Sequence, residues 1–164
     1  MRKSLILIMM IAIGLFLFAG AECFAADEIK VGAVQPVTGR FAFAGVHINA
    51  GLEDALMMAN EEGGINGKQI KYIMEDGTYS VDKAVAAFKR IMARDNPPIM
   101  YGESTGMGKA VAPEIKDRYK VLYSSTSFSS ELANAAANPY VFVPGPTYSD
   151  MFGILLKYIA QEKP

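Results

Sequence analysis

Short apolar runs alternate with amphipathic segments from about residue 29 to the end of this chain. Four of these runs predict β-strands, at residues 29–34, 70–75, 99–101 and 121–124, and the run at 141–143 is a candidate fifth strand. The runs are largely apolar along their length and lack the strict alternation of a strand that faces water on one side. Runs of this kind are typical of strands buried on both faces, as in a parallel sheet covered by helices.

The segments between the runs predict helices. In the first segment, apolar residues recur at helical spacing until Gly63. In the second segment, Ser80 is the expected N-cap. A shorter helix follows around Val111, with Pro113 close enough to its start to be tolerated. The last amphipathic segment carries Phe152 and its apolar neighbours.

This order of strands and helices predicts an α/β fold, a doubly wound parallel sheet with helices on both faces. Right-handed crossovers bring the strand-to-helix loops together at one edge of such a sheet, and ligands bind there. We therefore expect the functional site in the loops at residues 35–45, 76–80, 102–108 and 124–130.

Two of these loops are rich in hydroxyl groups. Ser104 and Thr105 follow the third strand among glycines, and six serines and threonines lie between residues 124 and 130. Hydroxyls and free backbone N–H groups at the mouth of a parallel sheet form a neutral cradle for an anion such as a carboxylate, helped by the start of the next helix. The alternative is that these residues only form turns and caps, which use the same residue types.

Phosphate-binding and catalytic motifs do not fit the chain. Ala110 stands where a Walker loop needs serine or threonine after Lys109, and Val111 stands where a dinucleotide fingerprint needs its third glycine. His47 is the only histidine, and because no nucleophile is tied to it by a motif we expect it to be a solvated surface residue. Metal-ligand spacing is not found either. We expect neither enzyme activity nor a cofactor.

Two further features of the loops leave a choice open. Phe41 and Phe43 in the first loop could form the wall of an apolar ligand pocket or could pack within the loop. Asp76, at the tip of the second strand, could orient a ligand amine or could cap the turn that follows.

The N-terminus has the pattern of a cleaved secretory signal peptide. Two basic residues precede an apolar stretch at 5–18, which is shorter than the ~20 residues needed to span a bilayer. Cleavage is predicted after Ala25, so that residues 1–25 are removed. The rival interpretation is a lipoprotein signal with an acylated Cys23, but Glu22 stands where such signals need a small residue.

Removal of the signal peptide leaves 14 basic and 16 acidic residues, a net charge of −2, without a run of like charges. This balance indicates neither nucleic acid nor an anionic membrane surface as a partner. Cys23, the only cysteine, is removed as well, so the fold must rely on its core without a disulfide.

Five segments carry a resemblance to a known family: IKVGAVQPVTGRFAFAG at 29–45, NEEGGINGKQI at 60–70, MEDGTYSVDKAV at 74–85, APEI at 112–115 and SSTSFSSEL at 124–132. In their order and spacing they resemble the branched-chain amino-acid solute-binding proteins of ABC transporters, which are leucine-binding-like type I periplasmic binding proteins. The resemblance implies a periplasmic protein whose two lobes close on an amino-acid-like ligand and deliver it to a membrane permease.

The resemblance also implies which residues of the first lobe hold the ligand. The family's hydroxyl ligand in the third loop falls on Thr105, with Ser104 or Gly106 as alternatives because this loop is one residue shorter here. In the fourth loop, the family's main-chain contact falls on Thr126, with Ser127 beside it.

Other positions depart from the family pattern. Phe128 stands where the family usually has a threonine, and the tyrosine of the first loop is replaced near Ala44, beside Phe43. These changes argue against leucine, isoleucine and valine themselves. Phe41, Phe43 and Phe128 around a hydroxyl cradle would suit a ligand with a larger apolar or aromatic part, or an amide.

Members of the resembled family are considerably longer, which implies that this chain is an N-terminal fragment. Residues 26–146 correspond to an incomplete first lobe and residues 147–164 to the start of the second lobe. Made alone, the chain is expected to expose Phe152, Leu155 and Ile159. The alternative function is that of a ligand-sensing domain in a receptor or regulator with the same lobe fold.

Overall fold

The computed structural model describes residues 28–162, so the predicted signal peptide lies outside the described residues. Its strands are β1 (Ile29–Gln35), β2 (Ile70–Asp76), β3 (Ile99–Gly102), β4 (Leu122–Ser125) and β5 (Val141–Phe142). They form one sheet in the order β2-β1-β3-β4-β5, and every neighbouring pair is parallel. The predicted parallel sheet, including its short fifth strand, is confirmed.

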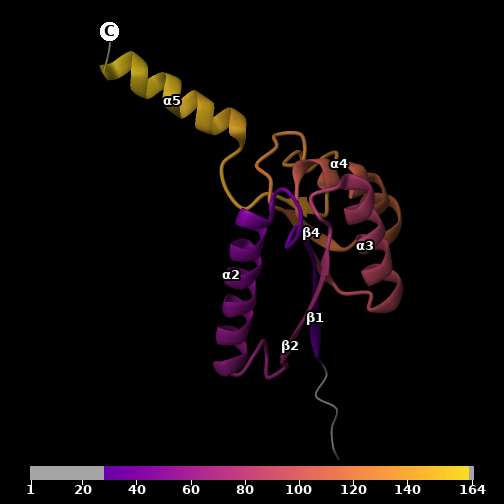
Figure 1. Cartoon of the computed structure of the whole chain (residues 1–164). Helices are drawn as coiled ribbons and strands as arrows, with labels where there is room; N and C mark the ends of the chain where they lie inside the picture. The colour runs from indigo at the N-terminus through magenta and orange to yellow at the C-terminus, as the bar shows by residue number, and fades with distance from the viewer. Residues whose placement is uncertain (1–27, 163–164) are drawn as a thin grey trace, which may run out of the picture.

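Helices cover both faces of this sheet. They are α2 (Ala42–Glu61), α3 (Val81–Arg94), α4 (Thr105–Glu114) with a π-helical continuation η1 (Ile115–Tyr119), and α5 (Tyr148–Glu162). Figure 1 shows α2 on one side of the sheet and α3 with α4 on the other. This arrangement is the doubly wound α/β fold that the sequence predicts. The strand order reverses direction between β1 and β3, which is where such folds open a crevice for ligands.

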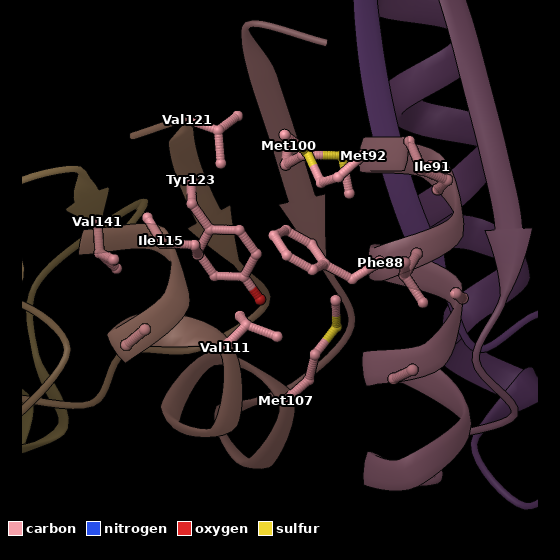
Figure 2. Close-up of a cluster of buried hydrophobic side chains, with 14 of the residues drawn as sticks. Phe88, Ile91, Met92, Met100, Met107, Val111, Ile115, Val121, Tyr123 and Val141 are labelled. Atoms are coloured by element: carbon pink, nitrogen blue, oxygen red, sulfur yellow. The ribbon is translucent and has the colours of Figure 1, made fainter. Parts of the chain in front are cut away.

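The main hydrophobic core lies between the sheet and the α3–α4 layer (Figure 2). Phe88 of α3 is fully buried, and its ring makes edge-on contacts with the rings of Tyr119 and Tyr123 at centroid distances of 5.3 and 6.3 Å. Burial of one such ring contributes about 1.5–3 kcal/mol. The core on the α2 side of the sheet is smaller, since only Gly45 and Asn49 of that helix are buried.

Two helices begin earlier than expected, inside segments that the sequence assigns to loops. Helix α2 begins at Ala42 and helix α4 at Thr105. The sequence places the glycines of their first turns in loops, whereas in the structure these glycines allow close packing within the helices. A Cβ on Gly45 would lie 2.1 Å from the Pro36 carbonyl oxygen, and a Cβ on Gly108 would lie 2.9 Å from Leu132 Cδ1.

Two other helix residues, Ser80 and Pro113, differ in part from the sequence prediction. Ser80 does occupy the N-cap of α3, as predicted, but its side chain makes no capping hydrogen bond. Pro113 was expected near the start of its helix and instead lies inside α4, close to its C-terminal end. The wider π-helical turn follows two residues later, and Lys120, with φ of 51°, ends it in the left-handed conformation.

Helix α5 extends away from the sheet and its other helices (Figure 1). None of its described residues is buried, and Phe152 is 61% exposed. Leu155 and Ile159 on the same helix are exposed as well. The predicted exposure of these three apolar side chains is confirmed.

Candidate ligand-binding site

The loops that follow the first four strands meet at the carboxyl-terminal rim of the sheet. Loop one is tied to the end of β2, because the Thr38 amide and hydroxyl both donate to the Asp76 carboxylate. Hydrogen bonds likewise join the second loop to the third and the third loop to the fourth. Residues from four separate loops therefore form one continuous surface.

The hydroxyl side chains of Thr105 and Ser127 lie at this rim and bond to each other. Thr105 is the first residue of α4, Ser127 follows β4, and their oxygens are 2.7 Å apart. Ser127 is buried, and its Oγ already accepts a hydrogen bond from the Ser129 amide at 3.2 Å. If Ser127 donates its proton to Thr105, the O–H of the half-buried Thr105 is free to donate to an anion. The structure thus brings together two residues that the sequence predicts as ligands.

Ser104 and Gly106 flank this pair with different roles. Ser104 is the N-cap of α4, and its hydroxyl accepts from the Met107 amide at 3.2 Å. Gly106 is exposed in the first turn, where helix amides have no intrahelical acceptor and the helix dipole favours a negative charge. Capping therefore occupies the Ser104 hydroxyl, while the helix start itself can attract a carboxylate.

Thr126 and Phe128 continue the fourth loop. The Thr126 amide donates to the Gly102 carbonyl oxygen at 2.8 Å, so a main-chain contact to a ligand at this residue would use its carbonyl group. Phe128 contacts the Tyr148 ring edge-on at 5.8 Å, and its carbonyl oxygen accepts from the Tyr148 amide. Phe128 thus lies against the start of α5.

A separate aromatic group forms at the other half of the rim. Phe41 stacks on Tyr79 with ring centroids 4.3 Å apart and an angle of 15° between the rings. Arg40 places its guanidinium 5.5 Å from the centre of the same Tyr79 ring. Phe43 contacts Phe41 at 5.2 Å but is 73% exposed, and the adjacent Ala44 lies in the same first turn of α2. The three phenylalanines of the sequence hypothesis thus divide between two groups.

Asp76 acts as a turn cap in this structure. Its carboxylate accepts hydrogen bonds from the Thr38 hydroxyl and from the amides of Thr38 and Thr78. Partial burial works to raise the pKa of Asp76, but these hydrogen bonds outweigh it and hold the pKa below its ordinary value. His47, as expected, is exposed on α2.

Glu103 is the residue at the rim that sequence reasoning missed. It follows β3 directly, its side chain is almost fully buried at 1% exposure, and its Oε2 accepts from the Tyr79 amide at 3.2 Å. Burial raises the pKa of the Glu103 carboxyl, the Tyr79 hydrogen bond opposes that rise, and the nearby Asp76 charge adds to it. Among residues 28–162, no group hydrogen-bonds to the second oxygen of Glu103 or to the side-chain amide of the buried Gln35.

A hollow lies elsewhere, on the flank of α4 and η1. It encloses about 530 Å³ and is lined by Lys109, Ala112, Pro113, Lys116, Asp117, Glu131, Leu132, Ala137 and Asn138. An ion pair between Lys109 and Glu131 spans it. We favour the rim as the ligand site because it holds the convergent hydroxyls and the helix start.

Within the described residues, no group of His, Cys, Asp and Glu has the geometry to hold a metal ion. Across the same residues, no helix combines the length and the apolar character that crossing a bilayer requires.

A parallel sheet of this strand order, covered on both faces and with hydroxyls at its carboxyl-terminal rim, defines one lobe of a two-lobed ligand-binding protein. The family model described as periplasmic binding protein matches residues 28–164. The chain therefore belongs to the periplasmic binding protein family, and the resemblance seen in the sequence is confirmed. Membership of this family implies a place outside the cytoplasm.

Individual relatives agree with this assignment. The Leu/Ile/Val-binding protein homolog 7 of Brucella melitensis is 33% identical over 112 residues, which are 68% of this chain and 26% of the relative. The leucine-, isoleucine-, valine-, threonine-, and alanine-binding protein of Pseudomonas aeruginosa is 30% identical over 103 residues, 63% of this chain and 27% of the relative. This chain thus spans about a quarter of the length of these curated relatives.

Solved structures show the same lobe. A branched-chain amino acid ABC transporter protein from Thermus thermophilus with bound valine aligns with a TM-score of 0.76 and 26% identity, over 84% of this chain and 36% of that one. A fatty acid ABC transporter substrate-binding protein from Thermomonospora curvata aligns with a TM-score of 0.69 and 23% identity, over 83% of this chain and 34% of that one. The second likeness concerns the fold alone.

Proposed function

We propose that this chain is the ligand-binding part of an extracytoplasmic solute-binding protein that delivers a small carboxylate ligand, an amino acid or a compound like one, to the permease of an ABC importer. In this proposal residues 1–25 are a cleaved signal peptide that directs the protein to the periplasm. Residues 26–146 form the first lobe, residues 147–164 begin the second, and the protein has no catalytic activity. The bonded hydroxyl pair at the sheet rim is the observation that carries the proposal.

The ligand's carboxylate would lie at the start of α4. Thr105 donates its hydroxyl hydrogen to one carboxylate oxygen, and Ser127 keeps Thr105 oriented from behind. The exposed amide of Gly106 and the helix dipole add to the attraction. Thr126 contributes its carbonyl oxygen as an acceptor for a ligand amine or amide N–H. Hydrogen bonds to a charged group are worth about 1.5–3 kcal/mol each, so a cradle without lysine or arginine can hold an anion.

The remainder of the ligand would be apolar or aromatic. Phe41 and Tyr79 offer a stacked aromatic surface on one side of the rim, and Phe128 offers a second apolar surface on the other. This composition suits a side chain larger than that of valine. Closure of a second lobe over the rim would exclude water from these contacts and raise the affinity.

A ligand panel tested by thermal unfolding of the full-length protein checks this function. The panel contains L-valine, L-leucine, L-phenylalanine, phenylacetate and hexanoate, with phenethylamine as the matched compound that lacks a carboxylate. A ligand present at 100 times its Kd stabilises the folded state by about 2.7 kcal/mol, which moves the unfolding temperature by several degrees. We expect such a shift with at least one carboxylate and none with phenethylamine. Equal shifts with the amine, or no shift with any carboxylate, would refute the proposal.

A further inference from the structure

The loop between β2 and α3, residues 77–80, has a conformation that needs a partner to hold it. Thr78 and Tyr79 both have positive φ, 55° and 58°, which side chains with a Cβ rarely adopt. Two such residues in a row persist only where the surroundings fix them. The loop is therefore held by contacts outside itself.

Glu103 provides the contact at the centre of this loop. Its Oε2 accepts the hydrogen bond of the Tyr79 amide, at the second of the two strained residues. Gly77 makes room for the carboxyl, because a Cβ there would lie 2.3 Å from Glu103 Oε2 and 2.7 Å from its Cδ. The carboxyl thus fills the inside of the turn and pins it to the end of β3.

The same loop carries the aromatic surface of the rim. With its backbone fixed, Tyr79 presents its ring to Phe41, which is the N-cap of α2, and to the guanidinium of Arg40. If the Tyr79 backbone left its left-handed conformation, the ring would leave this stack. The aromatic surface therefore depends on the hydrogen bond from the Tyr79 amide to Glu103.

Glu103 also adjoins the hydroxyl half of the rim. The next two residues along the chain are Ser104, which caps α4, and Thr105, whose hydroxyl bonds to Ser127. One buried side chain therefore connects the surface suited to a ligand's apolar part with the group suited to its carboxylate. Such a residue affects selectivity by placing another residue, without touching the ligand.

We propose that Glu103 is a positioning residue for ligand selectivity, which holds the Tyr79 loop so that the Phe41–Tyr79 stack receives the apolar part of the ligand. This inference rests on the proposed function, since it assumes that the hydroxyl pair holds the ligand's carboxylate at the same rim. It adds a residue that determines which carboxylates bind well.

Two substitutions in the full-length protein separate positioning from general support of the fold. Glu103→Gln keeps an oxygen that can accept from the Tyr79 amide, whereas Glu103→Leu fills similar space without an acceptor. Tyr79→Leu removes the ring and keeps the amide. The binding probes are L-phenylalanine and L-valine in titration calorimetry, and hydrogen exchange at the Tyr79 amide is measured without ligand.

We expect Glu103→Gln to match the wild type in both measurements. Glu103→Leu should speed exchange at the Tyr79 amide and weaken L-phenylalanine binding roughly two- to twelvefold, the loss expected for one aromatic contact, with little change for L-valine. Tyr79→Leu should weaken L-phenylalanine by a similar factor, and the double variant should lose no more than either single variant.

Four results would count against the inference. A loss of both affinities by the same factor in Glu103→Leu would assign the residue to the general fold. Unchanged exchange at the Tyr79 amide in that variant would show that another contact holds the loop. Failure of Glu103→Gln to restore either readout would exclude the acceptor role. If the wild type binds neither probe, the proposal that the ligand is an amino acid is refuted, and the selectivity claim for Glu103 is refuted with it. The hydrogen-exchange result would still decide whether Glu103 holds the loop.

Discussion

Replacement of Thr105 by valine tests the hydroxyl pair directly, because valine has nearly the shape of threonine and lacks only the hydroxyl. In the free protein, the Thr105 and Ser127 oxygens are 2.7 Å apart, and the substitution there removes one neutral hydrogen bond. Such a bond is worth about 0.5–1.5 kcal/mol. In the bound protein it removes the same bond and also a hydrogen bond to a carboxylate, worth about 1.5–3 kcal/mol.

The difference between the two states sets the expected loss of affinity. It is the carboxylate bond alone, because the bond to Ser127 is lost in both states, and it amounts to about 1.5–3 kcal/mol, so the Kd for the carboxylate should rise roughly ten- to 150-fold. Titration calorimetry at 25 °C, with the panel carboxylate that stabilises the full-length protein most, measures this change. Thr105→Ser keeps the hydroxyl and serves as the matched control, with a Kd expected to stay within about twofold of the wild type.

A second substitution locates the effect in the pair. Because Ser127 orients the Thr105 hydroxyl, Ser127→Ala should weaken binding less in the Thr105→Val background than in the wild type. The reasoning would be refuted if Thr105→Val bound the carboxylate as tightly as the wild type while its unfolding temperature fell. That result would make the hydroxyl pair a purely structural contact.

Two further predictions concern the supporting loops. Gly77→Ala should destabilise the full-length protein by about 1–3 kcal/mol in urea unfolding, since its Cβ would overlap the Glu103 carboxyl and lie 2.8 Å from Val34 Cγ1. Gly51→Ala is the matched control. A Cβ on Gly51 would meet nothing within 4 Å, so this substitution should stabilise helix α2 by about 0.5–1 kcal/mol. Because the folded pKa of Asp76 is lowered from its ordinary 3.8, its contribution to stability is complete above that pH and is lost as pH falls through the folded pKa. Urea unfolding of wild type and Asp76→Asn from pH 6 to pH 2.5 should therefore show a stability gap that narrows only in the acid range, and a gap constant over all pH values would contradict the shift.

The strands were the most predictable part of this fold. Buried parallel strands leave a continuous apolar run in the sequence, so the predicted strands differ from the observed ones by only one residue at their ends. The starts of α2 and α4 were not predictable in the same way. Gly45 and Gly108 resemble loop residues in the sequence, and only the packing against Pro36 and Leu132 shows why glycine is needed inside a helical turn.

The candidate site was predictable only where the order of the strands determines which residues lie side by side. Thr105 and Ser127 follow adjacent parallel strands, so the fold itself brings them together. Tyr79 and Glu103 carry no such signal, because a positive φ at tyrosine and a buried carboxyl that accepts from a distant amide arise only from three-dimensional contacts. Phe43 was placed wrongly in a loop because α2 begins one residue before it, and the helical turn leaves its ring largely in solvent.

Because the strand order reverses between β1 and β3, the two halves of the rim carry different kinds of side chain. Loops after β1 and β2 bear the Phe41–Tyr79 stack, whereas those after β3 and β4 bear the Thr105–Ser127 hydroxyl pair and Phe128. The first pair of loops can therefore be exchanged to admit a ligand with a different apolar part, while the proposed carboxylate site at the hydroxyl pair stays unchanged. Such an exchange would have to keep the hydrogen bond from the Tyr79 amide to Glu103.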